Sequence, residues 1–164
     1  LDEARMILQK AAHTDSPTIK AEAFFILAQI SVNEHNSAKA LDFLYEADIK
    51  KVSASELFAA RGATELSQEP YVAVLLQGVS DHLVKIDELI VTYAQGWDMD
   101  RMPPIDRNIL RIAIFEILWA ADIDLQVACD QAVELAKSIS TDESSSYING
   151  VLGRIIKLKD SIAI

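Results

Sequence analysis

Cysteine is nearly absent from this sequence, which has a single thiol, at Cys129, among 164 residues. One cysteine excludes an internal disulfide and a thiolate-rich metal site. A reducing compartment suits such a chain, so we expect a cytoplasmic protein. We place Cys129 in a packed helix core rather than at a reactive site.

Long hydrophobic runs and glycine-rich or proline-rich stretches are also missing. The longest apolar stretch, Ile112 to Asp122, is interrupted by Glu116 and is too short to cross a bilayer, so we expect no membrane association. Only five Gly and four Pro occur, while hydrophobic residues make up 51% of the chain, which predicts a folded, helical protein. The chain begins at Leu1 rather than Met, so we expect a processed or trimmed sequence.

Positive charge is scarce, with 15 basic against 25 acidic residues and a net charge of −10. Affinity for a phosphate backbone comes mainly from clustered Lys and Arg, which argues against a generic nucleic-acid binder. Any RNA binding would need a local patch. His13, His35 and His82 have no partners at metal-ligand spacing, and no nucleophile or phosphate-loop motif occurs. We therefore expect no enzyme, no cofactor and no metal site.

Helical periodicity dominates the N-terminal part, and alternating strand patterns are absent. The face of residues 1–12 recurs 36 positions later in residues 38–50, as Ala4, Leu8 and Ala11 become Ala40, Leu44 and Ala47. Between them, Pro17 opens a helix that carries Phe24, Leu27 and Ala28, and Asn33 to Ser37 predicts a turn. Residues 1–37 are thus expected to form a helical hairpin on the 38–50 helix, either tetratricopeptide-like or generically amphipathic.

Five further helices follow from proline, glycine, capping and periodicity signals. Ser53 to Glu56 has capping-box form and starts a short helix that ends near Gly62. Pro70 opens a long helix that ends before Gly96, with a face of Val72, Leu75, Leu76, Val79, Leu83, Ile86, Ile90 and Tyr93. Pro103 and Pro104 set the start of a nearly all-apolar helix through Trp119, which we expect to be central and buried. The last two helices carry inward faces of Ala128, Ala132, Leu135, Ala136 and Ile139, and of Ile148, Leu152, Ile155 and Ile156.

Three segments share their order and spacing with a known family: residues 96–113, 130–137 and 147–152. They resemble the NusB family of bacterial transcription antitermination factors, and the resemblance runs from about Ala38 to Arg154. It implies an all-α fold in which residues 38–164 form a NusB-like pair of packed helical subdomains. Residues 1–37 would be a repeat-like extension, an antiparallel helical hairpin.

The resemblance also implies a function, that of a non-enzymatic adaptor in rRNA transcription. Such a protein docks NusE, a small-subunit ribosomal protein, and boxA-type RNA on the transcription elongation complex. By this resemblance, Lys39, Arg107, Ser144 and Tyr147 are candidate RNA-binding residues. Tyr45, Asp106 and Glu143 are candidate contacts with the partner protein.

Several of these residues also have explanations that need no ligand. Asp106 lies in the first turn after Pro104, where the helix dipole stabilises a carboxylate. Arg107 and Arg111 can pair with a carboxylate such as Asp106 or Glu116. Residues 141–147 can be a loop and helix cap, although their hydroxyls, backbone N–H groups and aromatic ring could also hold a phosphate and stack a base. At Asn149-Gly150 we favour close helix packing over ligand binding.

The chain departs from the family where the first helix should open with an arginine-rich run. The residues before Ala40 are Val32 to Lys39, and Lys39 is the only cation among them. Losing several cations should lower RNA affinity by orders of magnitude. Gln131 also stands where the family commonly has Glu, which removes a charge and keeps the shape.

Three functions remain open on this basis. The first is the antitermination adaptor, with weak boxA-type RNA binding. The second is a protein-only interaction module, a chimera or divergent fusion that keeps the fold and has lost RNA binding. The third is the NusB-like domain that some RNA methyltransferases carry, although these residues contain no cofactor motif.

Overall fold

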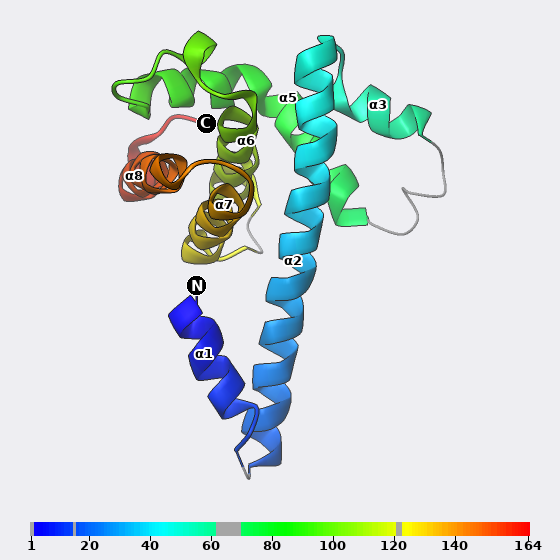
Figure 1. Cartoon of the computed structure of the whole chain (residues 1–164), viewed down its shortest axis with the longest axis vertical. Coiled ribbons are helices and arrows are strands. Elements are labelled where there is room, and N and C mark those ends of the chain that lie inside the picture. The colour runs from blue at the N-terminus through cyan, green and yellow to red at the C-terminus, as the bar shows by residue number, and fades with distance from the viewer. Residues whose placement is uncertain (1, 15, 62–69, 121–122) are drawn as a thin grey trace. The chain divides into compact units, whose positions relative to one another are not determined.

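The computed structural model describes residues 2–14, 16–61, 70–120 and 123–164. All regular elements in these ranges are helical (Figure 1), which confirms the predicted all-α class. The chain divides into two compact units, Leu1–His35 and Asn36–Ile164.

The first unit is a helical hairpin made by α1 (Asp2–Ala11) and the first part of α2 (Pro17–Lys50). Nη2 of Arg5 in α1 donates to Glu34 Oε2 of α2 at 2.7 Å, and Ala12 and Ala23 are buried in this unit. Phe24 was expected to pack inward, but its side chain is 52% exposed. The side chains of Leu27 and Ala28 lie outside the described residues.

The predicted turn at Asn33 to Ser37 is wrong, because α2 continues through it from Pro17 to Lys50. Polar residues alone do not end a helix, and this segment contains neither Gly nor Pro. Asn36 and Ser37 are themselves buried. Their polarity therefore does not mark a surface turn.

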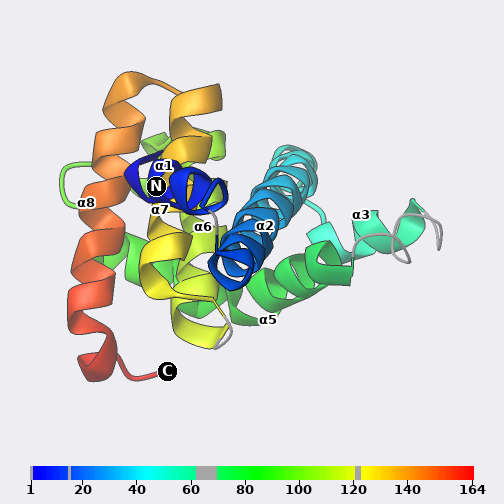
Figure 2. The same cartoon turned by 90° about the horizontal axis from the view of Figure 1, so that it is seen from below.

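The second unit contains the end of α2 together with α3 (Ala54–Ala60), α5 (Pro70–Tyr93), α7 (Leu125–Ile139) and α8 (Asp142–Leu158). Helix α6 (Pro104–Trp119) packs against α5, α7 and α8. Figure 2 shows α6 between α5 and the α7–α8 pair. The short 3-10 helices η1 (Met99–Arg101) and η2 (Lys159–Ser161) complete this unit.

Local signals explain where these helices begin and end. Oγ of Ser53 accepts from the backbone N–H of Glu56 at the start of α3, and Thr141 caps α8 in the same way. Asp124 caps α7. Gly96, with φ of +89°, follows the end of α5 in the left-handed region that glycine favours. Gly62 and the polar loop predicted after it lie outside the described residues.

Helix α6 is the central, buried helix that the sequence predicts. Leu110, Ile114 and Ile117 are at most 1% exposed, and Phe115 also lies in the core. Helix α5 approaches closely at Gly78, where an added Cβ would come within 2.1 Å of the Phe115 ring. Two expected core positions differ, since Leu83 and Ile139 are 36% and 46% exposed.

Among the helices that the structure describes, none combines the length and apolar character needed to span a bilayer.

Candidate functional site

A network of ion pairs joins α2, α5 and α6. Arg107 Nε and Nη2 donate to Asp48 Oδ2 at 3.1 and 2.6 Å, and Arg107 Nη1 donates to the carbonyl oxygen of Met99 at 2.9 Å. Arg111 Nε and Nη2 donate to the two carboxylate oxygens of Asp87, both at 2.8 Å. Each nitrogen of Arg107 thus has a partner within the protein, which leaves one N–H on Nη1 and one on Nη2 for any external ligand.

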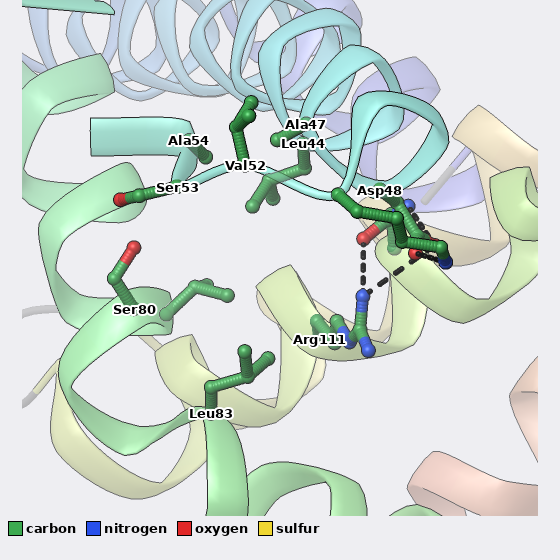
Figure 3. Close-up of a pocket in the computed structure, with 12 residues that line it drawn as sticks. Leu44, Ala47, Asp48, Val52, Ser53, Ala54, Ser80, Leu83 and Arg111 are labelled. Atoms are coloured by element: carbon green, nitrogen blue, oxygen red, sulfur yellow. Dashed lines mark hydrogen bonds and ion pairs between the residues drawn. The ribbon is translucent and has the colours of Figure 1, made fainter. Parts of the chain in front are cut away.

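The same network borders a pocket of about 430 Å³ (Figure 3). Leu44, Val52 and Leu83 line its apolar part, and Asp48 and Arg111 lie on its polar side, 3.6 Å apart between Oδ2 and Nη1. Burial opposes ionisation of Asp48, but hydrogen bonds from Arg107 and Lys51 and nearby guanidinium charge outweigh it. The pKa of Asp48 is therefore below its ordinary value.

The partners of these arginines differ from those the sequence suggested. Asp106 and Glu116 were the carboxylates expected beside Arg107 and Arg111, yet the observed partners are Asp48 and Asp87. Those partners lie on other helices, far away in sequence, where helical spacing carries no information. The interpretation of the arginines as ion-paired residues agrees with the structure, although the named partners were wrong.

Asp106 is completely buried at the contact between α6 and α8. Its Oδ1 accepts from the hydroxyl of Ser140 at 2.6 Å, and its Oδ2 accepts from the hydroxyl of Ser144 at 2.7 Å. Ser144 is also only 1% exposed. A partner protein cannot reach Asp106, nor RNA Ser144, in this structure. The surface roles expected of these two residues are therefore not available to them here, and both instead tie the start of α8 to α6.

Tyr147 lies one turn further along α8, where its half-buried ring packs against Trp97. The ring centroids are 4.8 Å apart, and Trp97 is 37% exposed. The hydroxyl of Tyr147 is buried with no hydrogen-bond partner among the described residues. Burial raises the pKa of Tyr147, partly offset by the charge of Arg154, so the hydroxyl stays protonated at neutral pH.

The remaining candidate residues lie on α2 and in the first turn of α8. Lys39 is half-buried on α2, Tyr45 is 41% exposed on the same helix, and Glu143 is exposed in the first turn of α8. Tyr45 and Glu143 are accessible to a partner, whereas Lys39 offers less surface.

A buried polar cluster surrounds Glu116 where α6 faces α2 and α7. Tyr71 donates its hydroxyl to Glu116 Oε1 at 3.0 Å, and Glu116 shares a cavity of about 10 Å³ with Ser37 and Gln131. Burial raises the pKa of Glu116 to about 7, against which the Tyr71 hydrogen bond acts. With Gln131 at this cavity, rather than Glu, a second buried carboxylate is avoided.

Cys129 is buried as expected, and its thiol lies 3.6 Å from Asn149 Oδ1. Burial raises the pKa of Cys129 to about 11, so the thiol stays protonated and poorly nucleophilic. In the part of the chain that the structure describes, no group of three or more His, Cys, Asp or Glu side chains could hold a metal ion.

The close packing predicted at Gly150 is wrong, because an added Cβ there would meet no neighbouring atom of the described residues within 4 Å. Sequence reasoning also missed Trp97, Arg154 and Asp48. The sequence shows that residue 97 is aromatic, but nothing in it predicted the contact of Trp97 with Tyr147. Arg154 could have been predicted from its spacing, because it follows Tyr147 by seven residues, which is two helical turns along the same face.

The described residues form an all-α fold around the buried helix α6, which is the class of fold that the family resemblance implied. The chain belongs to the NusB family, whose sequence model matches residues 18–157. This match begins well before Ala38, where the motif-based resemblance started, and it includes most of α2.

Known relatives and structures agree with this membership. The transcription antitermination protein NusB of Thermobifida fusca is 46% identical over 127 residues, which cover 77% of this chain and 89% of the relative. NusB of Salinispora arenicola is 46% identical over 123 residues, covering 71% and 89%. The structure of T. maritima NusB is similar with a TM-score of 0.69 and 27% identity, over 76% of this chain and 89% of that one.

A further similar structure contains NusB and NusE in complex with double-stranded RNA. Its matched chain has a TM-score of 0.67 and 22% identity, and the match covers 77% of this chain and 97% of that one. At this identity the similarity shows the fold alone.

Proposed function

We propose that this chain is a non-enzymatic transcription antitermination adaptor of the cytoplasm, which docks NusE and boxA-type RNA on the transcription elongation complex. The observation that carries the proposal is the 46% identity with a NusB antitermination protein across 89% of that protein's length. Such identity over nearly a whole relative supports a shared function as well as a shared fold.

The two partners would use different parts of the second unit. Tyr45 and Glu143 are exposed and are proposed to contact NusE. Tyr147, beside Trp97, is proposed to contact RNA, since an aromatic ring can stack on an unpaired base. Asp106 and Ser144 would act indirectly, by fixing the start of α8 on which Glu143 and Tyr147 lie.

Calorimetric titration of NusE into the full chain tests the protein contact. Wild type should bind with a dissociation constant in the micromolar range or tighter, and Tyr45→Ala and Glu143→Gln should weaken binding with little change in the melting temperature. Val84→Ala is a suitable control, because Val84 is 86% exposed on α5 and is not a proposed contact. No heat of binding for wild type at micromolar concentrations would contradict the proposal.

One observation favours an alternative, a protein-only interaction module that keeps the NusB fold. Arg107 is held by Asp48 and the Met99 carbonyl, and the arginine-rich run is absent before Ala40. Both reduce the cations available to phosphates. Binding of NusE without any gain in RNA affinity would support this alternative over the adaptor.

A further inference from the structure

Most cations of the second unit are already neutralised by carboxylates. Seven of these cations have a carboxylate oxygen within 4 Å of a side-chain nitrogen: Lys50, Lys51, Arg61, Lys85, Arg107, Arg111 and Lys137. On α8 the situation differs, because neither Arg154 nor Lys157 forms an ion pair with any residue that the structure describes. Both are exposed. Their charge is therefore available to an external anion.

The local charge of this helix is opposite to that of the whole chain. Residues 144–159 contain Arg154, Lys157 and Lys159 and no acidic residue, in a chain whose net charge is −10. The acidic residues Asp142 and Glu143 precede this stretch and Asp160 follows it. An anionic partner is therefore favoured along the middle and C-terminal turns of α8 rather than at its start.

Gly150 lies in the middle of the same face. Steps of three and four residues place Tyr147, Gly150, Arg154 and Lys157 along one side of α8. Glycine destabilises a helix interior relative to alanine, and here no neighbouring atom lies within 4 Å of the position that a Cβ would take. Packing within the protein does not explain this glycine, whereas close approach of an external molecule would.

Two side chains of this face, Tyr147 near its start and Arg154 near its C-terminal end, are fixed in position. At one end, the ring of Tyr147 packs against the partly exposed Trp97. At the other, Arg154 Nη1 donates to the carbonyl oxygen of Tyr93 at 2.7 Å, which anchors the guanidinium at the end of α5. Its remaining N–H groups have no partner among the described residues. Aromatic rings for bases beside fixed cations for phosphates are the elements of a single-strand nucleic-acid surface.

We propose that single-stranded RNA lies along the outer face of α8, from Tyr147 across Gly150 to Arg154 and Lys157. Gly150 permits the closest approach of the RNA, and Arg154 and Lys157 contact its phosphates. This inference rests on the proposed function. It assigns the cationic contacts to α8, which carries unpaired cations, whereas α2 lacks the arginine-rich run that the family resemblance leads us to expect before Ala40.

Fluorescence anisotropy with labelled single-stranded boxA-type RNA, on the full chain with saturating NusE, tests this surface. Gly150→Ala should weaken RNA binding about tenfold. That is the loss expected if the added methyl group displaces one close contact between the RNA and the helix. Val84→Ala is the control, because Val84 is 86% exposed on α5 and is not a proposed RNA contact. Both alanine variants should melt at the wild-type temperature or above, because alanine favours helix.

Salt dependence tests the cations separately. Lys157→Gln and Arg154→Gln should each reduce the slope of log affinity against log salt by about 0.7, the value for one phosphate contact of a single strand. Lys85→Gln, which removes a cation already paired with Glu88, should leave the slope unchanged.

Wild-type affinity for RNA retained in Gly150→Ala, or an unchanged salt slope in both glutamine variants, would overturn the inference and leave the adaptor function standing. Loss of NusE binding in Gly150→Ala would instead assign this face to the protein partner and equally overturn it. Failure of wild type to bind RNA even with NusE bound would overturn both the inference and the adaptor function.

Discussion

Replacement of Glu116 by glutamine tests the energetic consequence of the buried carboxyl. The pKa of Glu116 is raised from 4.5 to about 7 in the folded protein by burial, against the hydrogen bond from Tyr71. The folded state therefore keeps this proton to higher pH than the unfolded state does. Stability from this group is complete below pH 4.5 and is lost as the pH rises through about 7.

The size of the effect follows from the difference between the two pKa values. At roughly 1.4 kcal/mol per pH unit, wild type should lose about 3 kcal/mol of unfolding free energy between acidic and mildly alkaline pH. Glutamine cannot ionise, and its carbonyl oxygen can still accept from Tyr71. The unfolding free energy of the variant should thus exceed that of wild type by up to about 3 kcal/mol near pH 8. The two values should differ by under about 1 kcal/mol near pH 4.

Urea unfolding followed by circular dichroism across this pH range measures the difference. The quantity to compare is the difference in unfolding free energy between variant and wild type at each pH. Carboxylates with lowered pKa, such as Asp48, change stability in the opposite direction as pH falls, but they do so in both proteins. Glu88→Gln is the control, because Glu88 is exposed. A difference curve for Glu116→Gln that stays flat with pH would refute the assignment of a buried, proton-retaining carboxyl.

Other substitutions test the contacts that hold the second unit together. Asp106→Ala should lower the unfolding free energy by about 2–4 kcal/mol, measured by urea denaturation, because the part-buried hydroxyl of Ser140 and the buried hydroxyl of Ser144 lose their acceptor. Asp48→Ala should cost about 2–3 kcal/mol in the same assay, since it leaves a part-buried arginine without its carboxylate. Gly78→Ala should lower the melting temperature markedly, because its Cβ would meet the ring of Phe115 at 2.1 Å. Leu110→Ala should cost about 2–5 kcal/mol, and a cost below about 1 kcal/mol would contradict its central place in α6.

The helices of the second unit were predictable because their ends carry strong local signals. Pro70 and Pro104 stand at the first positions of α5 and α6, and Gly96 follows α5 with positive φ. Between such signals the apolar spacing identified most of the buried face. The failure came at Asn33 to Ser37, where polar residues lie inside a continuous helix. Helix propensity tolerates Asn and Ser, so only the tertiary environment decides between turn and helix there.

The candidate site was less predictable, because it depends on contacts between distant helices. Asp106 is an acidic first-turn residue in sequence, but its role depends on Ser140 and Ser144 of the α7–α8 region. Arg107 likewise has its carboxylate on α2, at Asp48. Family resemblance named these positions without showing which were buried. The proposed role of the exposed face of α8 could not be predicted from the sequence, because it depends on which cations are ion-paired and on the open space at Gly150.

One RNA titration, performed with and without NusE, tests whether this chain joins NusE and RNA. Labelled boxA-type RNA is titrated with the full chain at physiological salt, and anisotropy reports binding. We expect weak binding by the chain alone, given its net charge of −10, and at least about tenfold tighter binding when NusE is saturating. Equal affinity with and without NusE, or no RNA binding in either case, would contradict this expectation.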